Sequence, residues 1–262
     1  MPTTPPGVRF VAVGDVFVDV LVAGEGHDAD VRLTPGGAAV NAALSAAGAG
    51  ATVEILGCIG DDAGGRMLQA ELAARGVHSS LGIDPDRPTG TFVTVDGEIR
   101  VDRGANASFL PKQLPPVIEA DAALVSGYLP VATVTAALER SDAAWNALAV
   151  AHLTHLPDDG NAVFMNEDEA RTIAGTGPEE AVRLLAQRYR LVCVTIGASG
   201  AIGALDGQLE STAVGGVGRA PSNRPGAGDA FAAAALVALA GGASLPDALA
   251  EGCRAGALAL EP

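Results

Sequence analysis

Short apolar runs that alternate with helical segments constrain the fold more than any other feature of this sequence. The apolar runs occupy 8–13, 52–58, 122–126, 162–165 and 191–196. Turn residues and segments with helical spacing of apolar positions separate most of them, and two Ala-rich helices are expected at 227–239 and 245–258. Short strands that alternate with helices of this length predict an α/β chain with a largely parallel sheet.

One segment does not fit this alternation. The runs 91–95 and 99–103 flank Asp96-Gly97-Glu98, and Asp-Gly between alternating runs is a strong hairpin signal. We therefore expect a small β structure beside the main layer, in the place of a lid.

Composition excludes several classes of protein. The chain has 16 Lys and Arg against 31 Asp and Glu, a net charge of −15, so nucleic acid and anionic membrane surfaces are not expected as partners. Hydrophobic residues make up 48% of the chain and charged residues 18%, which predicts a large buried core. The only lysine, Lys112, has no Gly-rich run before it, and this excludes a P-loop nucleotide site.

The cysteines and the N-terminus indicate a cytoplasmic protein. Cys58, Cys193 and Cys253 are far apart and form no CxxC pair, which favours free thiols in a reducing compartment. The first residues carry neither the basic nor the apolar segment of a secretory signal. The longest uncharged run, 230–246, is shorter than the roughly 20 strongly apolar residues that a bilayer span needs.

The strongest chemical signal is Gly226-Ala227-Gly228-Asp229 ahead of an Ala-rich helix. Two glycines let backbone N–H groups approach an anion, and a helix N-terminus adds free donors and partial positive charge. An aspartate beside a bound phosphate repels it unless the aspartate is there to take a proton, so Asp229 is a candidate base. The alternative is that Asp229 caps the helix.

A second glycine motif lies near the start of the chain. Gly36-Gly37 precedes Asn41 by about one helical turn. The glycines allow close backbone approach, and the Asn41 amide offers both a donor and an acceptor to a hydroxyl. The alternative is a Gly-rich turn followed by a helix with an incidental asparagine.

A third motif is Asn166-Glu167-Asp168-Glu169. Asn166 and Glu169 share one helix face and could hold the water shell of Mg²⁺. The alternative is a capping box, in which the same two residues close the helix N-terminus.

Two further signals follow predicted strands. A glycine turn at 197–200 ends the run 191–196, and the carboxyl ends of parallel strands are where α/β folds bind ligands. Asp15 and Asp19 follow the first run, and acids with apolar flanks are costly unless they are paired or face a ligand.

The order of these motifs is more informative than any one of them. Gly-Asp…Asp, Gly-Gly-x-x-x-Asn, Asn-x-x-Glu, Thr-x-Gly and Gly-Ala-Gly-Asp follow one another over nearly the whole chain. In this order they resemble the ribokinase-like, or PfkB, family of carbohydrate kinases, including its signature regions at 36–65 and 224–231. The resemblance implies a single ribokinase-like α/β domain over 1–262. Its doubly wound, mostly parallel sheet is flanked by helices, and a small β lid is formed by about 17–34 and 89–106.

The resemblance also implies an activity: transfer of the γ-phosphate of ATP to a hydroxymethyl group of a sugar or sugar-like molecule. Asp229 resembles the base, and the amides of Gly226, Ala227 and Gly228 resemble the anion hole. Glu169 and Asn166 resemble the residues that organise Mg²⁺, through water. Residues expected to hold the acceptor are Asp19, Gly37, Asn41, Arg103 and Asn106. Residues expected around the nucleotide are Asn166, Glu169, Thr195, Gly197, Gly200, Arg224 and Gly256.

Two departures from the family pattern carry their own expectations. Asn223-Arg224-Pro225 stands where the family usually has Asp-Thr, and that aspartate belongs to a monovalent-cation loop in some members, so activation by potassium is in doubt. The family's strand ahead of Asn-x-x-Glu is replaced here by 145–156, which predicts a helix and a missing or reshaped strand.

Two other functions remain open at this level. One is a nucleoside kinase of the same family, with Phe17, Phe92, Phe109 and Tyr128 as candidates to stack a base. The other is a family member that binds a sugar or nucleotide without turnover. Lids of this family often pair, so a homodimer through the lid is also an option.

Overall fold

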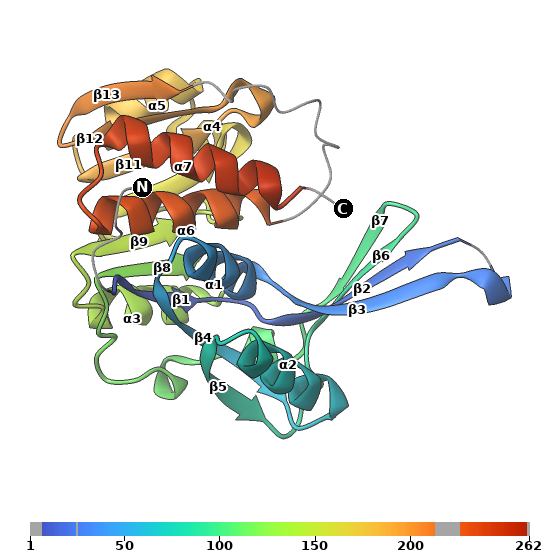
Figure 1. The fold of residues 1–262 in the computed structure, drawn as a ribbon. Coiled ribbons are helices and arrows are strands. Elements are labelled where there is room, and N and C mark those ends of the chain that lie inside the picture. The colour runs from blue at the N-terminus through green and yellow to red at the C-terminus, as the bar shows by residue number, and fades with distance from the viewer. Residues whose placement is uncertain (1–6, 25, 213–225, 261–262) are drawn as a thin grey trace.

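A nine-stranded sheet forms the centre of the molecule (Figure 1). The computed structural model describes residues 7–24, 26–212 and 226–260. The strand order is β13-β12-β11-β10-β9-β8-β1-β4-β5, and all neighbours are parallel except β12, which runs antiparallel to both β11 and β13. Its strands are β1 (Arg9–Val13), β4 (Thr52–Gly60), β5 (His78–Asp84), β8 (Ala122–Ser126), β9 (Trp145–Ala149), β10 (Ala162–Asn166), β11 (Leu191–Thr195), β12 (Ala201–Leu205) and β13 (Gln208–Thr212).

Helices cover both faces of this sheet. One face packs against α1 (Ala38–Gly48), α2 (Ala63–Ala74), α6 (Ala227–Ala240) and α7 (Leu245–Leu258). The other packs against α3 (Val131–Arg140), α4 (Glu167–Ala174) and α5 (Pro178–Leu185), with the short 3-10 turns η2 (Gly104–Ser108) and η3 (Pro111–Gln113). Because side chains alternate along a strand, Phe10 of β1 enters the first layer and Val11 the second.

Small residues bring α1 and α6 together. Both helices are rich in alanine on their buried sides, and the Ser45 hydroxyl of α1 donates a hydrogen bond to the Ala230 carbonyl of α6 at 2.9 Å. This contact fixes the N-terminus of α6 against α1, so that residues far apart in the sequence meet at one end of the sheet.

A second sheet of four strands projects from the body as an arm (Figure 1). It contains β2 (Phe17–Ala23), β3 (Asp30–Gly36), β6 (Thr91–Val95) and β7 (Glu98–Asp102), in the order β3-β2-β6-β7. The predicted hairpin between β6 and β7 is confirmed, because Asp96 and Gly97 form its two-residue turn with positive φ at both positions. We call this four-stranded sheet the lid; it draws on the segments expected for it, 17–34 and 89–106, and β3 extends to Gly36.

One expectation from the sequence was wrong, and one strand was missed. The segment 145–156 does not form a helix, because β9 pairs in parallel with both β8 and β10 and is almost wholly buried. Its Ala-rich run carries no periodicity that separates a buried strand from a helix. The sheet therefore has no missing strand at this place. The edge strand β5 was not anticipated, since its polar, partly exposed residues do not form an apolar run.

Within the described residues, no helix combines the length and the apolar character needed to cross a membrane.

Candidate active site

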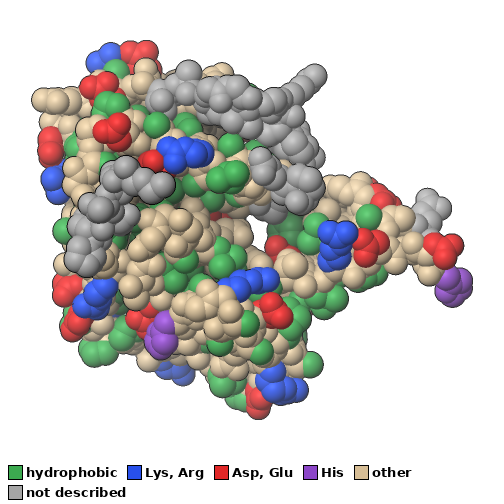
Figure 2. All heavy atoms as spheres, in the orientation of Figure 1, with side chains coloured by type: hydrophobic (Ala, Val, Ile, Leu, Met, Phe, Trp, Pro, Cys, Tyr) green, Lys and Arg blue, Asp and Glu red, His purple; other side chains and the backbone are tan. Residues whose placement is uncertain are grey.

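A cavity of about 560 Å³ lies at the carboxyl ends of the parallel strands, where the lid leaves the body. Strand β1 is the switch point of the topology, because the chain continues to β4 on one side of it and later returns to β8 on the other. Ligands of open α/β sheets bind at such points. Figure 2 shows the opening between the arm and the body. The residues that line the cavity include Asp15, Phe17, Asp19, Gly37, Asn41, Phe92, Val101, Arg103, Ser126, Tyr128, His152, Phe164, Asn166, Glu169, Thr195, Gly226, Ala227, Gly228, Asp229 and Phe231.

The N-terminus of α6 opens into this cavity. Gly226 precedes the helix with φ 103°, and a Cβ there would stand 2.8 Å from Nδ2 of Asn41, so only glycine fits without strain. Among the residues that the structure describes, no side chain caps this end. In the described part of the chain, the N–H groups of Ala227 and Gly228 have no acceptor. Unpaired amides at a helix N-terminus form an anion-binding site.

Asp229 lies in the first turn of α6, beside these amides. Its Oδ2 accepts a hydrogen bond from Nδ2 of Asn41 at 3.3 Å. Burial raises the pKa of Asp229 to about 7; the nearby carboxylates of Glu169 and Asp15 also raise this pKa, while the Asn41 bond lowers it. The alternative that Asp229 caps the helix is not realised. Its carboxyl group is instead suited to exchange a proton near neutral pH.

Asp19 projects from the lid strand β2 into the same cavity. Its carboxyl group lies over Gly36, where a Cβ would come within 2.1 Å of it, so the glycine makes room for the acid. Burial raises the pKa of Asp19 to about 7. Within the described residues, the buried Oδ1 has no hydrogen-bond partner, and such an atom is expected to be satisfied by a donor that arrives with a ligand.

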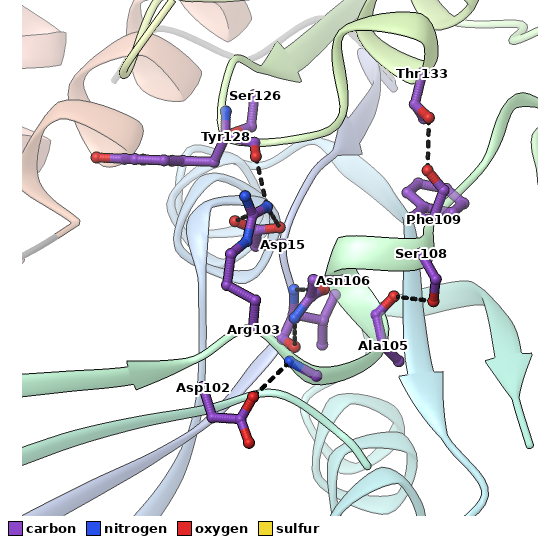
Figure 3. A network of polar contacts seen from close by, with 12 residues as sticks. Asp15, Asp102, Arg103, Ala105, Asn106, Ser108, Phe109, Ser126, Tyr128 and Thr133 are labelled. Carbon is purple, nitrogen blue, oxygen red and sulfur yellow. Dashed lines mark hydrogen bonds and ion pairs between the residues drawn. The ribbon is translucent and has the colours of Figure 1, made fainter. Parts of the chain in front are cut away.

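Arg103 and Asp15 form a partly buried ion pair at the base of the lid (Figure 3). Nη2 of Arg103 lies 3.0 Å from Oδ1 of Asp15 and also donates to the Tyr128 carbonyl. The Asp15 side chain is 4% exposed and that of Arg103 is 36% exposed. Burial raises the pKa of Asp15 even though Arg103 and His152 lower it. Arg103, which was expected to hold the acceptor, lines the cavity, where Asp15 neutralises its charge.

Asn166 and Glu169 form the capping box that was the alternative to an ion site. Oδ1 of Asn166 accepts from the Glu169 N–H at 2.9 Å, and Oε2 of Glu169 accepts from the Asn166 N–H at 2.8 Å. Both residues also line the cavity. Oε1 of Glu169 takes part in no hydrogen bond within the described chain, and burial raises the pKa of this carboxyl group. The cap thus aims Glu169 at the cavity and leaves one oxygen available.

Asn106 does not occupy the place expected for it. Its side chain is fully buried, accepts from the Val16 N–H and donates to the Val16 carbonyl, each at 2.9 Å. It does not line the cavity, so the prediction that it grips the acceptor was wrong; its role is to hold the chain where it enters the lid.

The residues expected around the nucleotide divide into three groups. Asn166, Glu169 and Thr195 line the cavity, whereas Gly197, Gly200 and Gly256 do not. Gly256 instead packs against α6, where a Cβ would stand 3.0 Å from the Ala227 carbonyl oxygen. Arg224 lies outside the described residues.

Sequence reasoning missed Ser126, Val101 and His152 as cavity residues. Ser126 ends β8 and His152 follows β9. His152 could be identified only once β9 was known to be a parallel strand whose carboxyl end meets those of β1 and β8.

The family model described as pfkB family carbohydrate kinase matches residues 9–261. The chain belongs to the pfkB family. A fructokinase of Klebsiella pneumoniae is 30% identical over 271 residues, which cover 91% of this chain and 86% of that protein. A ribokinase structure from Thermotoga maritima superposes with a TM-score of 0.82 at 21% identity over 95% of this chain and 92% of that chain. A Vibrio cholerae O395 fructokinase structure with fructose, ADP and calcium ion bound gives 0.78 at 22% identity over 97% and 93%.

Membership of the pfkB family confirms the resemblance read from the order of the motifs, and the structural matches confirm the ribokinase-like fold. As a pfkB kinase, the chain is an ATP-dependent phosphotransferase of the sugar and nucleoside class.

Proposed function

We propose that this chain transfers the γ-phosphate of ATP to a hydroxymethyl group of a sugar or sugar-like acceptor, with Asp229 as the general base. One observation carries this assignment: the Asp229 carboxyl group lies beside helix amides that have no acceptor among the described residues, in a cavity that also contains the Asp19 oxygen without a partner in the same part of the chain. The first arrangement suits a hydroxyl that loses a proton next to a phosphate. The second suits the other hydroxyls of the acceptor.

The residues divide the reaction between them. Asp229 accepts the proton of the acceptor hydroxyl as its oxygen bonds to the γ-phosphorus, and the bond from that phosphorus to the leaving oxygen of ADP breaks. The amides of Gly226, Ala227 and Gly228, with the positive end of the α6 dipole, stabilise the charge on the transferred group. Asn41 holds the Asp229 carboxylate in place through its 3.3 Å hydrogen bond.

Glu169 is the residue best placed for the Mg²⁺ that accompanies ATP. Its side chain lines the cavity and is held in position by the capping box with Asn166, and within the described chain its Oε1 atom takes part in no hydrogen bond. In the described part of the chain, no cluster of three or more His, Cys, Asp or Glu could form a protein cage for a metal. A single carboxylate such as that of Glu169 fits Mg²⁺, an ion that keeps most of its water ligands. When bound, Mg²⁺ would neutralise phosphate charge. Asn223-Arg224-Pro225 lies outside the described residues. The expectation about potassium activation, which was drawn from these residues, therefore stays a prediction.

The test is ADP release from ATP and Mg²⁺ over a panel of ketoses, aldoses, sugar acids, polyols and nucleosides, with wild type beside Asp229→Asn. Loss of the base should lower kcat by about 10²–10⁴-fold, while ATP still binds. Asp206→Asn is the matched control, because Asp206 lies in the exposed β12–β13 turn with positive φ, which asparagine tolerates. Turnover in Asp229→Asn within tenfold of wild type would sink the assignment. Binding of ATP with no ADP formed on any acceptor would favour the non-catalytic alternative.

We also propose that two copies pair through their lids. Strand register places Val20, Val31, Leu33 and Val93 on the lid face opposite Asp19, and Val31 and Leu33 are 51% and 56% exposed. A second copy would cover this apolar face. Light scattering on wild type and Leu33→Asp tests this, with a dimer expected only for wild type; a monomeric wild type would refute it.

For location, we propose the cytoplasm, where the free thiols Cys58, Cys193 and Cys253 would remain reduced. Fractionation of expressing cells tests this.

A further inference from the structure

On the lid face that lines the cavity, one row of side chains runs across strands β2, β6 and β7 and changes from polar to apolar along its length. Asp19 of β2 is the register partner of Phe92 of β6, and Phe92 is the partner of Val101 of β7. Register partners on neighbouring strands point to the same face with Cβ atoms about 5 Å apart. All three line the cavity. A hydroxyl-bearing group held at Asp19 therefore has an aromatic ring and then a branched aliphatic side chain beside it.

Aromatic residues are concentrated around this cavity. The chain has six Phe, two Tyr and one Trp in 262 residues, and five of these line the cavity. Phe164 and Phe231 are buried and pack edge to face, with ring centroids 6.2 Å apart. The other three are Phe17 and Phe92 on the lid and Tyr128 on the body.

These rings form two walls. On the lid, the ring centroids of Phe17 and Phe92 lie 6.4 Å apart. On the loops after β8 and β9, the ring centroids of Tyr128 and His152 lie 5.2 Å apart. Tyr128 is 45% exposed, and Figure 3 shows its ring extending from the loop after β8, away from the Asp15–Arg103 pair. An exposed tyrosine ring on a cavity wall is a surface on which a planar group can stack.

The charges of the cavity disfavour an anionic acceptor. Asp15, Asp19, Glu169 and Asp229 are acidic, and the one Lys or Arg side chain among the described lining residues, Arg103, is already paired with Asp15. An acceptor that carries its own negative charge would meet carboxylates without a free cation.

From these observations we infer that the acceptor is a neutral sugar derivative that carries a planar apolar ring, as a nucleoside or an aryl glycoside does. Its hydroxyls lie at Asp19 and Asn41, and its ring lies over Phe92 and Val101. This inference rests on the proposed phosphotransfer and narrows its substrate class. A free sugar would fill the polar end of the row and leave Phe92 and Val101 uncovered.

The first experiment compares acceptors that differ only in the ring. Initial rates of ADP release are measured with methyl and phenyl β-D-glucopyranoside, and with methyl β-D-ribofuranoside, uridine and adenosine. Stacking on aromatic side chains commonly changes binding by about tenfold or more per ring. We therefore expect kcat/KM at least tenfold higher for a ring-bearing acceptor than for its methyl counterpart. Preference for phenyl glucoside indicates the aryl glycoside class, and preference for uridine or adenosine the nucleoside class.

The second experiment removes the apolar surface. Phe92→Ala and Val101→Ala should each raise KM for the ring-bearing acceptor and reduce its advantage over the methyl counterpart, with KM for ATP unchanged. Ile99→Ala is the matched control, because Ile99 lies on the same lid face as Val101, two residues away, but does not line the cavity. It should leave the preference intact. Val101→Ala serves alone if Phe92→Ala does not fold.

The outcomes separate this inference from the proposed function. Transfer to methyl glycosides or to anionic D-gluconate at rates equal to or above those of the ring-bearing acceptors would overturn the inference and leave the kinase assignment standing. If no acceptor is phosphorylated, calorimetric titration of the full chain with the same glycosides decides. Tighter binding of the ring-bearing members supports the inference, and equal or absent binding refutes it.

Discussion

The side chain of Asn106 makes two hydrogen bonds to the backbone of Val16, which lies 90 positions earlier in the chain. Val16 stands between Asp15 and Phe17, both of which line the cavity. Asn106 follows the last lid strand, so its amide joins the point where the chain leaves the lid to the point where it enters (Figure 3). Asn106 is therefore a positioning residue, which acts on the cavity through the backbone of residue 16.

Replacement of Asn106 by Ala should loosen this junction. Two buried backbone groups of Val16 lose their partners, which should cost about 2 kcal/mol or more in the free energy of unfolding. KM for the acceptor should rise more than KM for ATP. Asn161→Ala is the matched control, because the Asn161 amide also makes two backbone hydrogen bonds, to Asn146 and Ala144, but does not line the cavity. Urea unfolding and steady-state kinetics measure both variants. Equal KM effects in the two would show that Asn106 is merely structural.

The sequence was informative where one local signal carries both structure and chemistry. The Gly37–Asn41 motif and the Gly-Ala-Gly-Asp turn were both picked out as sites of chemistry, and both line one cavity, because the carboxyl ends of parallel strands and helix N-termini meet at one edge. The lid hairpin followed from Asp96-Gly97 and the alternating runs on either side of it.

The errors arose where pairing over long sequence distances decides the structure. Strand β9 is an Ala-rich run that only its neighbours β8 and β10 define as a strand. Asn106 is hydrogen-bonded to the backbone of Val16, and Arg103 is paired with Asp15; the partners are about 90 residues apart in each case. Whether a polar side chain faces a ligand or the protein's own backbone depends on such partners, and no pattern in the sequence contains them.

The pair Arg103–Asp15 should show strong energetic coupling. Arg103→Ala leaves the Asp15 carboxylate buried and unpaired, and we expect a loss of about 2 kcal/mol in stability, less than the typical 3–5 kcal/mol for a fully buried pair because Arg103 is partly exposed. Asp15→Asn in the same chain should recover about 1 kcal/mol or more. A double-mutant cycle by urea unfolding at pH 7.5 measures this. Additive effects of the two changes would contradict the coupling.

Asp19→Asn should stabilise the protein at neutral pH and weaken the binding of the acceptor. The pKa of Asp19 is about 7 in the folded chain against 3.8 for the free group. The stability that this carboxyl contributes is therefore fully present below pH 3.8 and is lost as the pH rises toward 7. Asparagine does not ionise, so the Tm difference between the variant and wild type should grow between pH 4 and pH 7 and then level off. The rise at pH 7.5 should be of the order of 10 °C, since the difference between 3.8 and about 7 corresponds to roughly 4 kcal/mol and 1 kcal/mol shifts Tm by roughly 2–4 °C at this size. Calorimetric Tm values across this range test it, and a constant difference from pH 4 to pH 8 would contradict the raised pKa of the buried Asp19 carboxyl group.

The ionisation of Asp229 should set the acid limb of the rate profile. Its pKa is about 7, and the base must be deprotonated to take a proton, so kcat/KM should fall as the pH drops below 7 and level off above it. Asp19 has a similar pKa, so the profile is measured in wild type and in Asp19→Asn, where the limb that remains belongs to Asp229.

Two neighbours should move that limb in opposite directions. The Asn41 hydrogen bond lowers the pKa of Asp229 and the Glu169 carboxylate raises it. Asn41→Ala should therefore shift the limb to higher pH, and Glu169→Gln should shift it to lower pH while the glutamine keeps the capping box. Both variants will lower the rate itself, so the position of the limb is the informative quantity. Shifts in the same direction, or no shift in either, would mean that a group other than Asp229 controls the rate.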